Sequence, residues 1–189
     1  IDMKTIDERV AKILEMKFRL GLFENPFVNL KAIPKQVLTP QHRQTALDMA
    51  RRSIVLLKNE NSLLPLQKGR YKKIFVTGHN ADNQSILGDW SFEQPDENVS
   101  TVLEGIQAAD PDATIDYQDV GRNVQGLTKP QIAEAVSRAK QADLAILVVV
   151  ENSMRYHWKE KTCGENSDRY ELTLPGRQEQ LVEAVAATG

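Results

Sequence analysis

The chain has 189 residues, a formal net charge of −2 at pH 7 and a pI near 6.0. This near balance of charge excludes both the basic surface of a nucleic-acid-binding protein and a polybasic membrane-binding patch. A single cysteine excludes an internal disulfide, and no apolar run is long enough to predict a transmembrane helix. Because the chain begins with Ile1 and has no signal-peptide pattern, we expect a processed protein or a piece of a longer one.

The first predicted element is an amphipathic helix over residues 1–23, where apolar residues recur at helical spacing opposite a charged face. Thr5 followed by Glu8 is typical of a capping box, and Gly21 ends the pattern. Residues 26–40 contain three prolines and no clear period, which predicts an extended linker. One helix cannot bury its own apolar face. We therefore expect residues 1–25 to belong to a domain whose remainder is absent.

Residues 41–189 are predicted to alternate between helices and strands. A helix over residues 41–58 has Thr39 as its N-cap and a buried stripe of Ala46, Leu47, Ala50, Ile54 and Leu57. Strands are predicted near residues 72–78, 114–120 and 144–150, and helices over residues 101–109, from Thr128 onward and over 175–187. This alternation predicts an α/β fold with a mainly parallel sheet flanked by helices.

The strongest hydrophobic run is Leu144 to Val150, seven consecutive apolar residues. A run of this length, rich in β-branched side chains, is typical of a strand buried on both faces. A segment dense in carboxylates, arginines and aromatic residues follows it directly. In open α/β sheets, ligands bind at the loops after the carboxyl ends of strands. We therefore predict that this loop borders the functional site.

Other kinds of site are not supported by the sequence. Gly78 follows a predicted strand but lacks the G-x-G-x-x-G spacing of a dinucleotide site. The three histidines, His42, His79 and His157, show no metal-ligand spacing, so no metal or other cofactor is expected. Cys163 has no sequence neighbour that suggests a thiolate nucleophile. No serine lies in a nucleophile-elbow context.

Several motifs, in order along the chain, resemble glycoside hydrolase family three. They are Arg9-Val-Ala-Lys-Ile-Leu, Leu20-Gly-Leu-Phe-Glu-Asn-Pro-Phe, Ala46-Leu-Asp-Met-Ala-Arg-Arg-Ser-Ile-Val-Leu-Leu-Lys-Asn-Glu, Val76-Thr-Gly-His-Asn-Ala-Asp-Asn, Leu87-Gly-Asp-Trp, Thr101-Val-Leu-Glu-Gly-Ile and Gly164-Glu-Asn-Ser-Asp-Arg-Tyr-Glu-Leu-Thr-Leu-Pro-Gly. Together they cover essentially the whole chain.

The resemblance implies a retaining, exo-acting β-glycosidase that hydrolyses terminal β-linked sugars, as β-glucosidases and β-xylosidases do. In this family a (β/α)8 barrel carries the nucleophilic aspartate, and an α/β sandwich supplies the general acid/base. Residues 1–25 then correspond to the last barrel helix, 26–40 to the linker and 41–189 to most of the sandwich domain. The implied partners are an oligosaccharide or β-glucoside and the missing barrel, and the implied compartment is periplasmic or extracellular. Without the nucleophile, the isolated chain is expected to be inactive.

Two glutamates are candidates for the general acid/base. Glu165 lies in a Gly-Glu-x-x-Asp-Arg pattern similar to the glutamate-bearing loop of some family members. Glu151, directly after the strand, is placed similarly to the acid/base of others, and Glu160 has the weakest case. Most glutamates in proteins are solvated surface residues, and spacing alone does not separate these candidates. Both Glu165 and Glu151 therefore stay open.

The predicted substrate contacts are Trp90, His79, Arg155 and Tyr156. An indole face stacks on the apolar face of a sugar ring, and arginine forks and aromatic rings suit hydroxyl-rich ligands. Each has a structural alternative: Trp90 in packing between domains, His79 in a loop hydrogen bond, and Arg155 and Tyr156 in packing of the long loop. Arg169 is expected to form a structural ion pair with its neighbour Asp168.

A second class of function competes with the enzyme. The chain is alternatively a stand-alone, non-catalytic α/β module that binds carbohydrate or another partner. A nucleotide-binding doubly wound domain is a weaker third reading. The amphipathic helix at the start favours the first interpretation, since an unaccompanied helix followed by a linker is expected at the end of a preceding domain.

Overall fold

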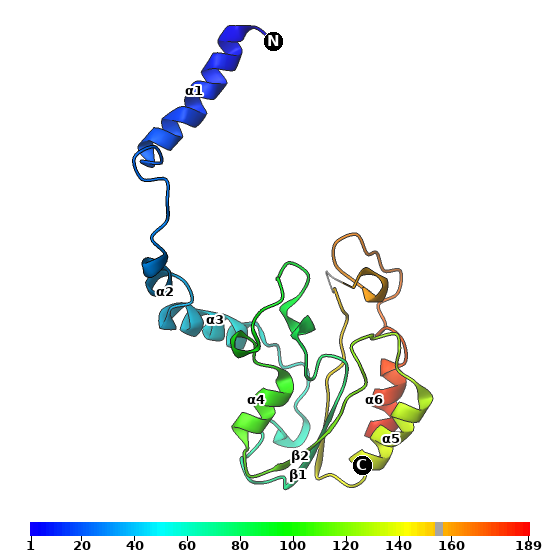
Figure 1. Ribbon diagram of the computed structural model, residues 1–189. Helices are drawn as coiled ribbons and strands as arrows, with labels where there is room; N and C mark the ends of the chain where they lie inside the picture. Colours follow the sequence, from blue (N-terminus) through cyan, green and yellow to red (C-terminus); the bar gives the residue numbers. More distant parts are fainter. Residues whose placement is uncertain (154–156) are drawn as a thin grey trace. The chain divides into compact units, whose positions relative to one another are not determined.

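The computed structural model describes residues 1–153 and 157–189. The chain divides into two compact units, Ile1–Glu60 and Asn61–Gly189. The first unit contains helices α1, α2 and α3, and the second contains the sheet with helices α4, α5 and α6 (Figure 1). None of the helices in the described residues combines the length and apolar character needed to cross a membrane.

The helices of the first unit differ in part from the prediction. Helix α1 (Met3–Arg19) is capped by Asp2, whose carboxylate accepts a hydrogen bond from the Thr5 amide at 2.7 Å. The capping box predicted at Thr5 is therefore wrong, because the helix begins earlier. The predicted linker contains a 3-10 turn (Leu30–Ala32) and the short helix α2 (Ile33–Gln36). Helix α3 (Pro40–Ser53) is capped by Thr39, as predicted, but ends before residue 58.

The apolar side chains of the first unit are exposed. No residue of α1, α2 or α3 is buried, and Ile13 and Leu57 keep 61% and 92% of their accessible surface. The stripe predicted to be buried on the second helix is therefore exposed in the described structure. Ala46, Leu47 and Ala50 lie on α3, whereas Ile54 and Leu57 follow its end, and none of the five is buried by the described residues.

The second unit confirms the predicted α/β class. Strands β1 (Lys73–Thr77), β2 (Thr114–Gln118) and β3 (Leu144–Leu147) form a parallel sheet in the order β2-β1-β3 among the described residues. Ile74 of β1 is in register with Ile115 of β2 and Leu144 of β3. The carboxyl ends of the three strands therefore lie at one edge of the sheet.

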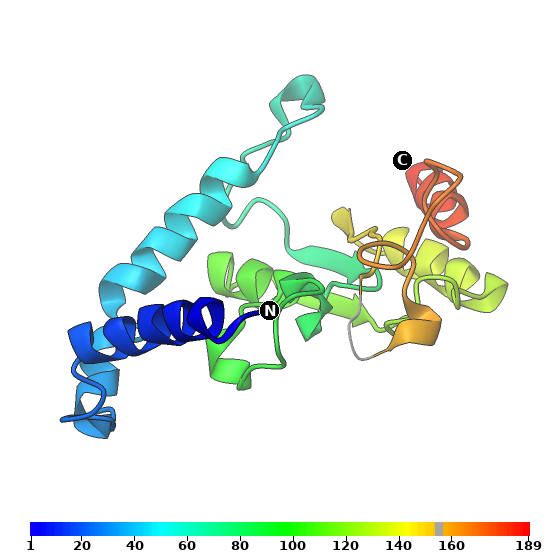
Figure 2. The same ribbon diagram turned by 90° about the horizontal axis from the view of Figure 1, so that it is seen from above.

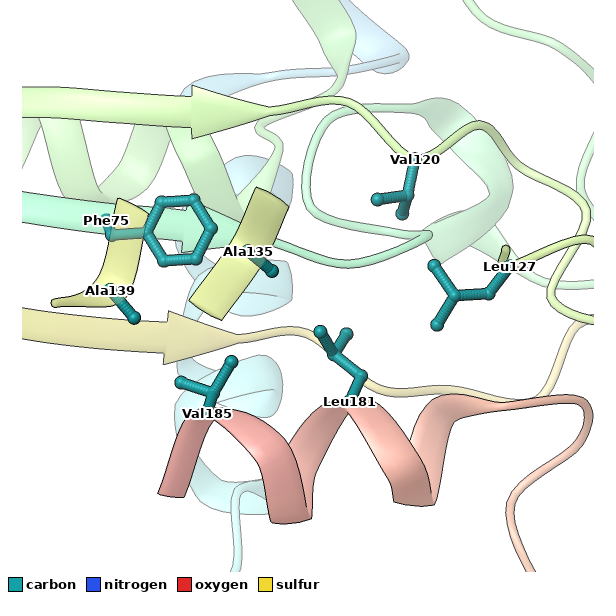
Figure 3. Close-up of a cluster of buried hydrophobic side chains, with 7 residues drawn as sticks. All are labelled: Phe75, Val120, Leu127, Ala135, Ala139, Leu181 and Val185. Atoms are coloured by element: carbon teal, nitrogen blue, oxygen red, sulfur yellow. The ribbon is translucent and has the colours of Figure 1, made fainter. Parts of the chain in front are cut away.

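Helices cover both faces of this sheet. Helix α4 (Val102–Ala109) lies on one face, and α5 (Lys129–Ala139) and α6 (Gln178–Ala186) lie side by side on the other (Figure 1 and Figure 2). Side chains along β1 alternate between the two faces of the sheet, so the strand contributes to the hydrophobic cluster on each face. Ile74 and Val76 pack toward Leu103 of α4. Phe75 points to the opposite face, into a cluster with Val120, Leu127, Ala135, Ala139, Leu181 and Val185 (Figure 3).

Strand β3 is less buried than the sequence predicted. All four of its residues are only partly buried, whereas Ile74 to Thr77 of β1 are fully buried. The prediction of burial on both faces is wrong for β3, because β3 is an outer strand of the described sheet. Strand β1, whose apolar run is shorter than that of β3, is the central strand.

Capping interactions fix where α4 and α5 begin. Thr101 and Glu104 form a reciprocal capping box at α4, and Thr128 and Gln131 form one at α5. Between the strands and helices, 3-10 turns occur at Gln84–Leu87, Asp96–Asn98 and Trp158–Glu160. These turns belong to the long loops that follow β1 and β3.

Candidate functional site

The predicted functional edge is built from the loops after β1, β2 and β3. Gly78 follows β1 directly with φ of +125°, and a Cβ there would lie 2.1 Å from the Val148 carbonyl oxygen. Only glycine allows the chain to turn at this point while the residue after β3 runs directly beside it. The loops after β1 and β3 therefore leave the sheet in contact with each other.

A buried asparagine joins all three loops. The Asn152 side chain, 1% exposed, accepts a hydrogen bond from the Asn80 side chain at 2.8 Å and donates one to the Arg122 carbonyl at 3.0 Å. Its backbone amide donates to the Thr162 hydroxyl oxygen at 3.0 Å. Asn152 and Asn80 are not among the site residues predicted from the sequence. Their position directly after predicted strands was the available signal.

Glu151 is held by two partners. Its carboxylate forms an ion pair with Arg169 and accepts a hydrogen bond from the Thr162 hydroxyl at 2.6 Å. The glutamate and arginine side chains are 25% and 26% exposed. The predicted pair between Arg169 and Asp168 is therefore wrong, although Arg169 does form a structural ion pair that holds the loop. The fold of the loop brings Arg169 to Glu151, at the end of the strand, rather than to its neighbour in sequence.

Glu165 has a different environment. It is exposed, and its carboxylate makes no hydrogen bond or ion pair with the described residues. It follows Gly164, whose φ of +88° is a left-handed conformation that favours glycine. A Cβ on Gly164 would lie 3.2 Å from Oδ2 of Asp89, so the loop of Glu165 packs against the residue that precedes Trp90. The two segments singled out from the sequence thus meet at this edge.

His79 is buried beneath these loops. It is 2% exposed, and its Nδ1–H donates to the Gly121 carbonyl at 2.6 Å, which leaves Nε2 without a proton in the neutral ring. Burial lowers the pKa of His79, against the opposing effects of the Gly121 carbonyl and the Asp119 charge. These contacts favour the hydrogen-bonded structural role over the predicted sugar contact.

Trp90 keeps 72% of its surface exposed, and its stacking on a sugar ring stays a prediction. The residues that follow Trp90 in the sequence line a cavity of about 360 Å³. Its lining includes Ser91, Phe92, Glu93, Asp96, Arg122 and His157. Arg122 bridges two residues of the β3 loop, with Nη2 3.1 Å from Nδ1 of His157 and Nε 3.3 Å from the Glu160 carboxylate. The predicted contacts Arg155 and Tyr156 lie outside the described residues.

The remaining candidate chemistry is not supported. The described residues contain no group of three or more histidine, cysteine or acidic side chains placed to hold a metal ion. Burial raises the pKa of the Cys163 thiol, although Lys161 acts in the opposite direction. A raised pKa favours the neutral thiol, which is a poor nucleophile. The β3 loop also carries Glu151, Glu160 and Glu165, and carboxyl groups are a side-chain type that transfers protons in enzymes.

Comparison with known proteins gives a consistent result. The model of the glycosyl hydrolase family 3 C-terminal domain matches residues 54–189. A β-xylosidase of Formosa agariphila is 35% identical to the chain over 99% of the chain and 26% of its own length. A β-glucosidase involved in saponin metabolism in intestinal bacteria superposes with a TM-score of 0.84 at 30% identity, over 100% of this chain and 28% of that one.

A β-glucosidase of Listeria innocua, solved in complex with glucose, gives a TM-score of 0.79 at 27% identity and covers 100% of this chain and 24% of that one. The chain thus spans about a quarter of the length of these relatives. The match to the family model covers the sheet, its helices and all three loops of the candidate site. The chain belongs to glycosyl hydrolase family 3, of which it contains the C-terminal domain sequence.

Proposed function

We propose that this chain is part of a retaining, exo-acting β-glycosidase that hydrolyses terminal β-linked glucose or a similar sugar. In this proposal Glu165 is the general acid/base, and the loops after β1 and β3 contact the leaving-group side of the substrate. The nucleophilic aspartate belongs to a barrel domain outside this chain. Support comes from the family membership and from the names of the relatives, which are β-glucosidases and β-xylosidases.

We choose Glu165 over Glu151 as the general acid/base because the two side chains have different surroundings. A general acid must release a proton to the leaving group and recover it later, so it needs access to substrate. Glu165 is exposed and without partners among the described residues, whereas Glu151 is paired with Arg169. A guanidinium partner stabilises the charged carboxylate and thus disfavours the protonated form that an acid has to supply. We therefore assign Glu151 a structural role.

The exposed apolar residues of the first unit support the second part of the proposal. Val10, Ile13 and Phe18 of α1 keep 47%, 61% and 61% of their surface exposed. Apolar exposure on this scale is typical of a surface that packs against another domain. We propose that the rest of the barrel covers it. Retaining hydrolysis needs two carboxyl groups roughly 5–5.5 Å apart, so the isolated chain, with only one of them, is expected to be inactive.

The test uses the full-length protein that contains this chain, with Glu165→Gln and Glu151→Gln compared on two aryl β-glucosides. Phenol is a poor leaving group that needs protonation, whereas 2,4-dinitrophenol leaves without it. Glu165→Gln should lower kcat/KM for the phenyl substrate by about 10²–10⁴-fold and leave the dinitrophenyl substrate nearly unaffected. Glu151→Gln should show no such difference between substrates. A selective loss in Glu151→Gln instead of Glu165→Gln would reverse the assignment. An inactive wild-type protein would favour the non-catalytic carbohydrate-binding module.

A further inference from the structure

The most deeply buried ion pair in the described residues joins Asp89 to Lys161. The Lys161 ammonium nitrogen lies 2.7 Å from Oδ2 of Asp89, and the lysine and aspartate side chains are only 2% and 8% exposed. Removing two charges from water costs free energy that their attraction often fails to recover, and an apolar pair of similar volume is frequently as stable. Stability alone therefore does not explain these two residues.

The pair connects the two loops that carry the proposed substrate-facing residues. Asp89 lies in the segment after β1, directly before the exposed Trp90. Lys161 lies in the loop after β3, between the Trp158–Glu160 turn and Glu165. The salt bridge is thus a direct link between the sides of the candidate site.

Gly164, which precedes Glu165, packs against the Asp89–Lys161 pair. A Cβ built on Gly164 would lie 3.2 Å from Oδ2 of Asp89 and 3.4 Å from Cε of Lys161. It would also lie 2.8 Å from Cβ of Ser153, so the space around Gly164 is filled. Because the Glu165 side chain makes no polar contact with the described residues, the path of its backbone sets where the carboxyl group lies.

Lys161 also fixes an aromatic residue at the rim. Its ammonium nitrogen lies 4.7 Å from the centroid of the Trp158 ring, within the range of a cation–π interaction. Trp158 is 57% exposed, so one part of the ring is held by the buried cation and the rest faces solvent. A single lysine therefore restrains Trp158, Asp89 and the backbone at Gly164.

We propose that Asp89 and Lys161 are positioning residues that set the place of the Glu165 carboxyl group relative to the leaving group. The inference rests on the proposed function of Glu165. Proton transfer requires the donor within hydrogen-bond reach of the leaving oxygen, and a displacement of about 1 Å costs up to about 10²-fold in rate. The pair acts through the backbone of Gly164 and does not itself touch the reacting atoms.

The experiment uses the full-length protein with Lys161→Met, Asp89→Asn and the double variant. Lys73→Met is the control, because Lys73 of β1 pairs with Asp116 of β2 at 3.5 Å and lies at the start of its strand, away from the loops at the carboxyl edge. Each variant is assayed for kcat/KM on the phenyl and the 2,4-dinitrophenyl β-glycoside that the wild type hydrolyses. Each single variant should lose about 10–100-fold on the phenyl substrate and less than about 3-fold on the dinitrophenyl substrate. The control should match the wild type on both.

A partly unfolded variant loses activity on both substrates equally, so the ratio of the two rates separates positioning from folding. If Lys161→Met does not fold because Asp89 stays charged and buried without its lysine, the double variant carries the same test without that buried charge. An unchanged ratio in the variants would overturn the inference, provided that Glu165→Gln changes the ratio. If Glu165→Gln also leaves the ratio unchanged, the result contradicts the proposed role of Glu165 as the general acid/base, and not only the positioning role of the pair.

Discussion

The guanidinium of Arg169 is paired with the carboxylate of Glu151, so the pair ties the far part of the β3 loop to the end of the strand. The Thr162 hydroxyl donates to the same carboxylate at 2.6 Å, and the Asn152 amide donates to that hydroxyl oxygen at 3.0 Å. The base of the loop is therefore a connected polar network. Glu165 lies outside this network, which is why the two glutamates differ in the roles that we propose.

Replacing Arg169 with Met should destabilise the second unit. The change leaves the Glu151 carboxylate without its cation in a site where it is only 25% exposed. We expect a loss of about 1–3 kcal/mol in the free energy of unfolding, because a charge that stays partly buried loses its compensation. Denaturant unfolding of the protein measures this loss. Lys129→Met, at an exposed position of α5, should change it by less than about 0.5 kcal/mol. Equal effects of the two substitutions would contradict a structural role for Arg169.

The helical layer over Phe75 should be sensitive to loss of volume at Leu181. This side chain is 1% exposed and lies in the cluster with Phe75 and Val185 (Figure 3). Leu181→Ala removes buried methyl groups and leaves a cavity, at an expected cost of about 2–5 kcal/mol. Leu172→Ala is the matched control, since Leu172 is fully exposed. Thermal unfolding should give a clear decrease for the first variant only; a similar midpoint for both would show that Leu181 is not part of a close-packed core.

His79 should make stability depend on pH. Because burial holds its pKa in the folded protein below the ordinary 6.5, protonation favours the unfolded chain. Above pH 7 the ring is neutral in both the folded and the unfolded state, so His79 does not make stability depend on pH there. As the pH drops below about 6.5, the ring is protonated in the unfolded chain first, and the free energy of unfolding falls. His79→Gln should flatten the profile of unfolding midpoint against pH between 7 and 5.5. His42→Gln, at an exposed position, should keep the wild-type slope. A His79 variant with an unchanged slope would show that another group titrates.

Local sequence patterns predicted most elements of the fold for identifiable reasons. The cap at Thr39, the helices that begin near residues 101 and 128, and the apolar strands depend on neighbouring residues, so they are readable from the chain itself. The order of the strands is not a local property. The most apolar run was therefore predicted to be the most buried strand. In the sheet, however, β1 is the central strand and β3 is an outer strand.

The position of the candidate site at the edge of the sheet was predictable from the sequence, but the contacts between its residues were not. The carboxyl edge of a parallel sheet follows from the alternation of elements, and the loop with Glu151 and Glu165 was located by it. The pairs Glu151–Arg169 and Asp89–Lys161 join residues distant in sequence, and only the folded loops bring them together. The same holds for the burial of His79, whose partner is the carbonyl of Gly121 in another loop.

The most direct measurement of the central claim is chemical rescue of Glu165→Ala in the full-length protein. Azide needs no general base, so it can attack the covalent glycosyl-enzyme intermediate that accumulates when the acid/base is missing. With a dinitrophenyl β-glycoside, we predict that azide restores turnover and that the product is the β-glycosyl azide, with the configuration of the substrate retained. No rescue by azide, or an α-configured azide, would contradict the assignment of Glu165 as the acid/base of a retaining glycosidase.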